Sequence, residues 1–240
     1  MLRLRCLSQL GMVPDVAALL EEADAQLVLV RHLYEESLLR QVVSAALRVK
    51  VKNVLENQRS ALEYLSHAIV TEVVGSIDRH VYYPLAPVRE QFLASMDKKM
   101  PGVREARPEI AVAVEKHQPY QPGHLWLSSL QDLTNENKHQ RLTPQTRAES
   151  LQISAGPGGG FVGRVGGAGI GLGQGASISL GPGASISFRG PGPLIEQNIV
   201  RHVIVDWLFD PSGLSALATL EEIQRNLGPA IHDILQVAGI

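Results

Sequence analysis

"SLLRQVVSAALRVKVKNVLENQRSALEYLSHAIVTEVVG", residues 37–75, decides the fold, because it runs from Ser37 to Val74 without a glycine or a proline. Its apolar residues recur at every third or fourth position, which is the period of a helix with one buried face. They are Leu38, Val42, Ala45, Leu47, Val51, Leu55, Leu62, Leu65 and Ile69. We predict one helix of unusual length, or two helices joined by a slight bend, ending at Gly75.

The same period occurs on both sides of this stretch. Upstream, "VPDVAALLEEADAQLVLVRHLYEE" predicts a helix that begins near Pro14 and Asp15, two residues suited to a helix start. Downstream, we expect shorter helices at Pro87–Met100 and Pro108–Lys116, preceded by an extended segment at "RHVYYPLAP". "HLWLSSLQDLTNENKHQ" then predicts an amphipathic helix. Its apolar residues are Trp126, Leu127, Leu130 and Leu133.

Glycine dominates the third part of the chain, where 15 of the 22 glycines fall between Gly156 and Gly192. This part contains three successive octads, "AGIGLGQG" (168–175), "ASISLGPG" (176–183) and "ASISFRGP" (184–191). Apolar and small residues alternate in each octad, which predicts three or four short antiparallel strands separated by turns. "NIVRHVIVDWLF" predicts a stronger strand, and "SGLSALATLEEIQRNLGPAIHDILQVAG" predicts a closing helix.

These patterns predict an α+β chain: a mainly helical bundle of about four to six helices with a small Gly-rich antiparallel β-sheet before a C-terminal helix. We expect residues 1–150 to form the bundle and 151–210 the Gly-rich insert. Residues 211–240 would form a helix that packs back on the bundle, giving one compact domain overall. The octads can be explained as a small sheet packed on the helices without any ligand.

The composition limits the classes of function. A formal net charge of -2 argues against a surface dedicated to coating DNA, and an aromatic content of 5% is too low for a base-stacking platform. The single cysteine, Cys6, excludes an intramolecular disulfide and a cysteine-based zinc site, which fits a reducing cytoplasm. We expect a cytoplasmic protein, because the N-terminus is a poor signal peptide and no apolar run is long enough to cross a membrane.

No standard catalytic motif is present. "GGGFVG" (158–163) has the glycine spacing of a dinucleotide-binding loop, but the glycine-rich residues after it cannot start the helix that such a loop requires. Among the eight histidines, His117, His124 and His139 lie closest together in the sequence. Their spacing fits no metal motif, so we interpret them as surface or capping groups, and we expect neither a metal nor a cofactor.

The first candidate site is the polar end of the Trp126 helix, "TNENKHQRLTPQ" (134–145). Asn137 and Arg141 continue the stripe of Trp126 and Leu130, whereas Asn135 and His139 lie one turn apart on another side. One interpretation is a buried hydrogen-bond network or a solvated helix end. The other is an anion or nucleotide site. Lys138 and Arg141 would bind phosphate there, and His139 would act as a general acid or base.

The second candidate is "NQRSALEYLSH" (57–67) on the long helix. Arg59 lies between apolar residues of a helix that must pack, so it needs an acidic partner or an anion. Glu63, one turn away, could form a salt bridge with it, and Tyr64 falls near Ser60 on the next turn. The open alternatives are therefore an internal ion pair and an anion site.

These segments resemble a widespread group of uncharacterised bacterial proteins. The resemblance rests on "RSALEYL" on a long helix, then "YYPLA", then "QPYQPGHLWLSSLQDLTNENKHQRL", and it covers roughly Val51 to Leu142. Asn135, Lys138 and His139 match the N-x-x-K-H helix end of that group. The arginine helix is in turn similar to the HEPN superfamily motif, in which an arginine precedes a histidine on one helix.

The HEPN resemblance implies a helical and often dimeric protein. Many members of that superfamily are metal-independent RNases of toxin–antitoxin and phage-defence systems. Arg59 matches the arginine, Tyr64 occupies the usual histidine position, and His67 lies three residues further on. The first hypothesis is a HEPN-like nucleic-acid-associated protein of bacterial defence or stress response, active or degenerate as a ribonuclease. RNA or a nucleotide and a second copy of the chain would be its partners, with no membrane.

In this hypothesis, Arg59 and His139 form the central catalytic pair, with Tyr64 and His67 as further candidates. The residues that would bind the nucleic acid or anion are Asn135, Lys138 and Arg141. The alternative hypothesis is a non-enzymatic binding or scaffold protein, in which these residues form a structural polar network.

Overall fold

The computed structural model describes residues 13–75, 80–139, 145–155, 162–166, 177–179, 185–187, 195–197, 199–210 and 212–240. It divides into two compact units. The described residues of Met1–Pro144 and Phe209–Ile240 form the first unit, and those of Gln145–Leu208 form the second. The described part of the chain is mainly helical, with seven helices in the first unit and antiparallel strands in the second. The expected helical chain with a small antiparallel sheet is confirmed at this level.

The two longest helices are α1 (Pro14–Arg40) and α2 (Ala45–Val74). The stretch from Ser37 is therefore divided between two helices, as one of the two alternatives predicted, but residues 41–44 separate them where a slight bend was expected. Gln41 takes the left-handed backbone conformation, with φ of 57°, and ends α1. Ser44 then begins α2, because its hydroxyl accepts a hydrogen bond from the Leu47 amide at 3.1 Å. The predicted ends at Pro14 and Gly75 are confirmed.

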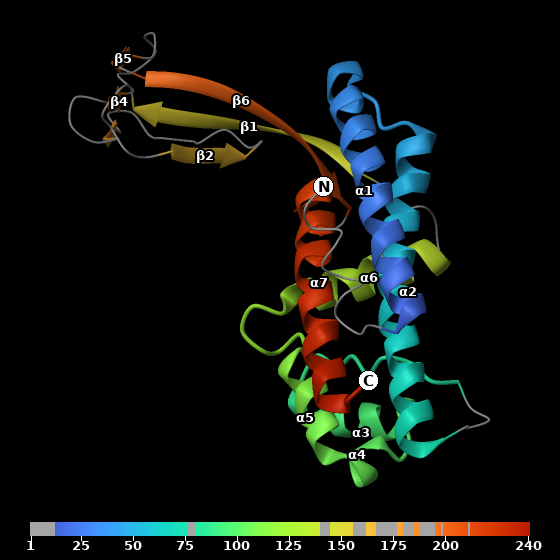
Figure 1. Ribbon diagram of the computed structural model, residues 1–240. Helices are drawn as coiled ribbons and strands as arrows, with labels where there is room; N and C mark the ends of the chain where they lie inside the picture. Colours follow the sequence, from blue (N-terminus) through green and yellow to red (C-terminus); the bar gives the residue numbers. More distant parts are fainter. Residues whose placement is uncertain are drawn as a thin grey trace. The chain divides into compact units, whose positions relative to one another are not determined.

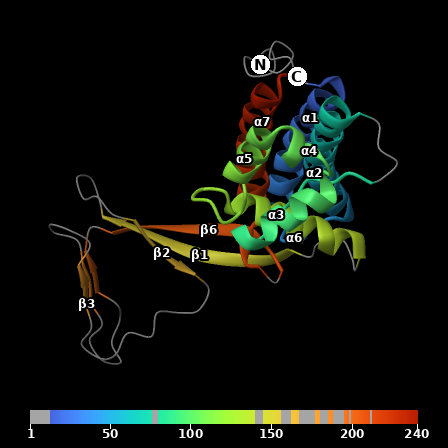
Figure 2. The same cartoon turned by 90° about the horizontal axis from the view of Figure 1, so that it is seen from below.

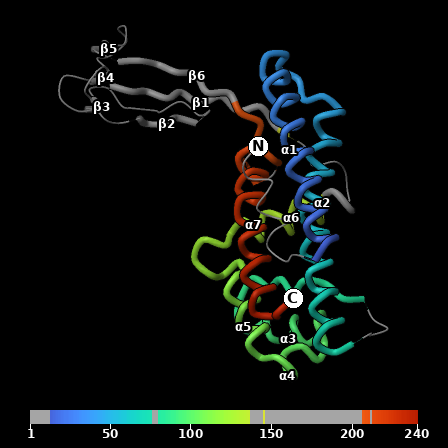
Figure 3. The backbone as a smooth tube through the Cα atoms, viewed as in Figure 1, coloured from blue at the N-terminus to red at the C-terminus, as the bar shows by residue number. Residues whose placement is uncertain are grey.

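α1, α2 and the closing helix α7 (Ala216–Ala238) lie side by side and build the core of the first unit (Figures 1 and 3). The buried residues of α1 are spaced alternately by four and three positions, as in a coiled-coil seam. They are Val16, Leu20, Ala23, Leu27, Val30, Tyr34 and Ser37. The seam explains how α1 packs along α2, since only one narrow stripe of it is buried.

A polar link crosses this core. Gln58 of α2 is fully buried, and its amide nitrogen donates to the Gln224 side-chain oxygen of α7 at 3.0 Å. The Gln224 amide nitrogen in turn donates to the Leu20 carbonyl of α1 at 3.1 Å. The two glutamines therefore join the three helices, and a slip of one helix along the others would leave buried amides unpaired.

Three short helices cover one end of the bundle: α3 (Arg89–Lys99), α4 (Val103–Ala106) and α5 (Pro108–Lys116). α3 and α5 confirm the predicted short helices, whereas α4 was not predicted. The preceding residues 80–86, which were predicted to be extended, form neither helix nor strand. Instead, the Ala86 amide donates to the side-chain oxygen of Gln118, which is buried.

The amphipathic helix α6 (Leu125–His139) is confirmed, because all four predicted apolar residues are buried. α7 packs against α1, α2, α5 and α6. A two-residue strand, β7 (Leu214–Ser215), precedes α7, which carries Pro229 in its interior. None of the described helices combines the length and the apolar character that a membrane crossing requires.

In the second unit, β1 (Gln145–Ala155) pairs antiparallel with β2 (Val162–Gly166), and the two lie side by side in Figure 2. The register runs from Ser150 opposite Gly166 to Ser154 opposite Val162. On its other side β1 neighbours β6 (Ile199–Phe209), which confirms the strong strand predicted there. β1 itself was not predicted, and its first residues extend into the range assigned to the helical bundle.

Two of the octads each contain a short strand, β3 (Ser177–Ser179) and β4 (Ser185–Ser187). They pair antiparallel with Ile178 opposite Ile186, and β4 also pairs with β5 (Ile195–Gln197). The equivalent Ser-Ile-Ser segments therefore stand in register, as the period of two predicts. The first octad, 168–175, lies outside the described residues.

Candidate functional site

Arg59 is held in an ion pair inside the first unit. Its Nη2 lies 2.5 Å from Oε1 of Glu63, one turn further along α2. The side chains of Arg59 and Glu63 are only 14% and 23% exposed. The other oxygen of Glu63, Oε2, accepts a hydrogen bond from the Tyr83 amide at 2.6 Å. The predicted salt bridge is confirmed, and it ties α2 to the segment before α3.

The charges around this pair are partly buried. The phenol of Tyr83 is 1% exposed, and burial raises its pKa far above the usual value, although the positive charge of Arg59 opposes this. Burial lowers the pKa of Lys99, and the charge of Arg59 lowers it further, whereas Glu63 raises it. Arg59, Glu63, Tyr83 and Lys99 thus form one polar cluster, which we call the Arg59 cluster.

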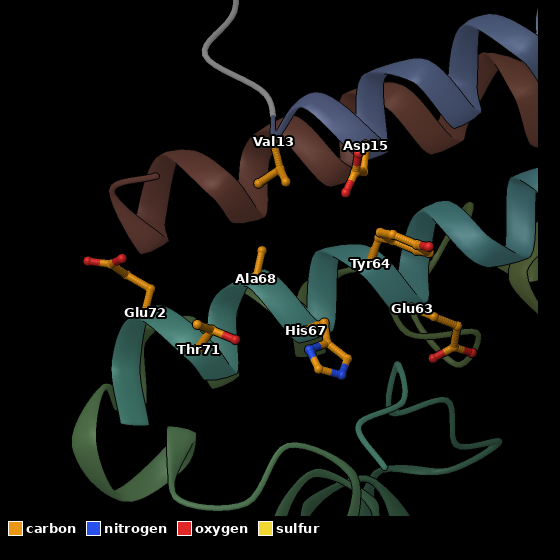
Figure 4. A pocket seen from close by; sticks show the side chains of 8 residues that line it. All are labelled: Val13, Asp15, Glu63, Tyr64, His67, Ala68, Thr71 and Glu72. Carbon is orange, nitrogen blue, oxygen red and sulfur yellow. The ribbon is translucent and has the colours of Figure 1, made fainter. Parts of the chain in front are cut away.

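Tyr64 and His67 line a cavity of 580 Å³, whose other lining residues come from the start of α1 and from the same part of α2 (Figure 4). We call this cavity the α1–α2 groove. It is lined by Val13, Asp15, Glu63, Tyr64, His67, Ala68, Thr71 and Glu72. The described lining does not include Arg59, so Tyr64 and His67 share a cavity with acidic residues and not with the predicted catalytic arginine.

The polar end of α6 is described only in part. Asn135 is exposed, and the preceding Thr134 is buried, with its hydroxyl donating to the Leu130 carbonyl at 2.7 Å. Lys138 and His139 belong to α6, but their side chains lie outside the described residues, as does the whole of Arg141. Pairing of Arg59 with His139 and phosphate binding by Lys138 and Arg141 therefore stay predictions. The same holds for the placement of Asn137.

The sequence interpretation missed a cluster of histidines at the C-terminal end of α5. His117 is 7% exposed, and its Nε2 lies 2.8 Å from Oδ2 of Asp233 on α7, which also accepts a hydrogen bond from Lys116 at 2.8 Å. The rings of His117 and His124 meet edge to face, with centroids 5.1 Å apart. Asn226 of α7 joins them in lining a cavity of 280 Å³.

This histidine cluster corrects the interpretation of His117 as a surface or capping group. The hydrogen bond from Lys116 is the main reason that the pKa of Asp233 lies below its usual value, and His117 adds to it. Burial lowers the pKa of His124, and the neighbouring His117 and Lys116 lower it further. A burial pattern cannot reveal such a cluster from sequence, because His117 and Asp233 lie 116 positions apart.

Across the described ranges, no three or more histidine, cysteine, aspartate or glutamate side chains are placed to hold a metal ion. No family model, curated protein or solved structure matches the chain. The site residues must therefore be interpreted from their own contacts.

Proposed function

We propose that the chain is a non-enzymatic binding protein, in which Arg59 has a structural role and the α1–α2 groove receives the ligand. The main support for this proposal is the ion pair of Arg59 with Glu63, whose other carboxylate oxygen accepts a hydrogen bond from the Tyr83 amide. A catalytic or phosphate-binding arginine needs its donors free for the ligand, and here one edge of the guanidinium is already bound to a carboxylate.

Releasing Arg59 toward a phosphate would carry an energetic cost. Glu63 would keep the Tyr83 amide but lose its cation, and a partly buried carboxylate without its partner is destabilising. Lys99, whose pKa is already lowered by burial and by Arg59, offers only a second, partly buried positive charge. Support for a structural role thus comes from Glu63, whose partly buried carboxylate depends on Arg59 staying in place.

The size and the lining of the α1–α2 groove support a binding function. Its volume of 580 Å³ falls within the range of about 300–1,000 Å³ that is usual for small-molecule sites. Tyr64 is 49% exposed there, which leaves much of its ring available to a ligand. Apolar, aromatic and charged groups thus converge on one space, as they do in ligand pockets.

The rival proposal is the HEPN-like ribonuclease, acting as a homodimer in bacterial defence. One observation favours it: the Nη1 atom of Arg59 is buried and has no hydrogen-bond partner among the described residues. A phosphate oxygen of RNA could occupy that position, with Lys99 as a second cation. Light scattering would measure the predicted dimer directly.

One experiment separates the two proposals. Purified protein is incubated with total RNA beside Arg59→Ala, His139→Ala and, as a matched control, Arg48→Ala, which removes an exposed arginine from the same helix. We expect no cleavage by any of the proteins, and a loss of stability for Arg59→Ala alone. Cleavage by the parent protein and by Arg48→Ala, abolished in a folded Arg59→Ala variant, would overturn the binding proposal in favour of the ribonuclease.

A further inference from the structure

We propose that the α1–α2 groove binds a linear polyamine, a methylene chain with ammonium groups at or near both ends. This inference deepens the proposed binding function and rests on it. It names the class of ligand from the placement of charge and apolar surface in the groove.

The shape of the groove follows from the spacing of residues on α2. Tyr64, Ala68 and Glu72 are four positions apart and form one stripe along the helix, with His67 and Thr71 beside it. Val13, at the start of α1, faces Ala68 from the other side (Figure 4). Val13 and Ala68 therefore give the middle of the groove an apolar surface, with His67 and Thr71 beside it, and acidic groups lie at its two ends.

Negative charge lies at both ends. Asp15 faces Tyr64 at one end, and Glu72 lies at the other (Figure 4). Tyr64 and Glu72 are eight positions apart, which corresponds to roughly 12 Å along the helix at the usual rise per residue. Neither carboxylate has an ion-pair partner within the described part of the chain. Glu63 contributes little, because Arg59 already neutralises it.

A linear polyamine matches this arrangement. Its ammonium groups would lie near Asp15 at one end and Glu72 at the other, and its methylenes would lie over Ala68 and Val13. The ammonium group near Asp15 would also face the exposed ring of Tyr64, which attracts cations. A single divalent metal ion does not match, because carboxylates at opposite ends of the groove cannot both bind one ion at the short distances that Mg²⁺ requires.

The test is isothermal titration calorimetry, which measures the heat of binding when spermidine is added to the full chain at low ionic strength. The variants are Asp15→Asn, Glu72→Gln and their combination, with Glu35→Gln as a matched control that removes an exposed carboxylate of α1 outside the groove. We expect each single variant to weaken binding about three- to tenfold, since each removes one exposed charge contact. The double variant should show no saturable binding, and Glu35→Gln should bind like the parent.

Three results would overturn the proposal. The first is no saturable binding of spermidine by the parent protein at millimolar concentration. The second is equal weakening by Glu35→Gln, which would mean a diffuse attraction of counterions. The third is equal affinity for butylamine, or displacement of spermidine by a lysine-rich peptide that binds more tightly, because the two-ended match would then be wrong.

A second variant guards against a loss of fold at Asp15 or Glu72. Ala68→Lys places a cation in the middle of the groove, and it should abolish spermidine binding while the helical circular dichroism signal is kept.

The result of the spermidine titration is independent of the result of the RNA assay. If the chain neither cleaves RNA nor binds spermidine, the polyamine inference fails alone; if Arg59-dependent cleavage is found, the proposed function fails whatever spermidine does.

Discussion

Replacing Glu63 with alanine should destabilise the helical unit more than any exposed substitution on α2. The carboxylate makes two contacts, the ion pair with Arg59 at 2.5 Å and the hydrogen bond from the Tyr83 amide at 2.6 Å. A hydrogen bond to a charged acceptor contributes about 1.5–3 kcal/mol, and an ion pair that is still partly exposed contributes about 1 kcal/mol. We expect a loss of about 3 kcal/mol in the free energy of unfolding.

Such a loss corresponds to a fall of roughly 6–12 °C in the melting temperature for a chain of this size. Thermal unfolding followed by the helical circular dichroism signal measures it. Glu63→Gln keeps a neutral acceptor for the Tyr83 amide and should lose about half as much. Glu72→Gln, an exposed change on the same helix, should stay within about 0.5 kcal/mol of the parent. If Glu63→Ala melts within about 2 °C of Glu72→Gln, the structural role of the Arg59 cluster is refuted.

Three further predictions concern the bundle. Gln224→Leu should cost about 1–3 kcal/mol, because the buried amide nitrogen of Gln58 then keeps only its longer contact of 3.4 Å with the Leu220 carbonyl. A Gln58→Leu, Gln224→Leu double variant should recover most of the loss, and additive losses in urea denaturation would contradict this. Gln41→Gly should raise stability by about 0.5–1 kcal/mol, because it relieves a left-handed conformation, and a lower urea midpoint would refute it. Since the folded pKa of His124 lies below its usual 6.5, the unfolded chain binds more protons as the pH falls through that value. Stability should therefore decline below about pH 6.5, and His124→Gln should flatten the decline in urea midpoints measured between pH 7 and 5; an unchanged slope would contradict it.

All the described helices of the first unit except the four-residue α4 were predictable, because their apolar residues follow the helical period. The break between α1 and α2 was not predictable. Gln41 adopts the left-handed conformation in which a helix end usually has a glycine, and without a glycine the sequence does not mark the end of α1. Ser44 is the N-cap of α2. It was not recognised as a helix start in the sequence, because the apolar pattern continues on both sides of it. β1 was missed because its polar sequence depends on pairing with β2, a long-range interaction that local periodicity does not report.

The Arg59 ion pair was predictable for the same local reason, because its partner lies one turn away on the same helix. The contact that completes the cluster, from the Tyr83 amide to Glu63, joins residues 20 positions apart and required the structure. The α1–α2 groove likewise brings Asp15 beside Tyr64 from another helix. Sequence patterns therefore located the charged residues, but only tertiary packing decided which ones remain free for a ligand.

The most direct test of the structural role of Arg59 is the NMR signal of its Nε–H group during a titration with RNA. The signal can be assigned by its absence from Arg59→Lys. We predict that it stays unshifted at saturating RNA and moves when Glu63 is replaced by glutamine, because the ion pair at Nη2 holds the guanidinium group to which Nε belongs. A saturable shift with RNA in the parent protein would show that Arg59 meets a phosphate and would contradict the account.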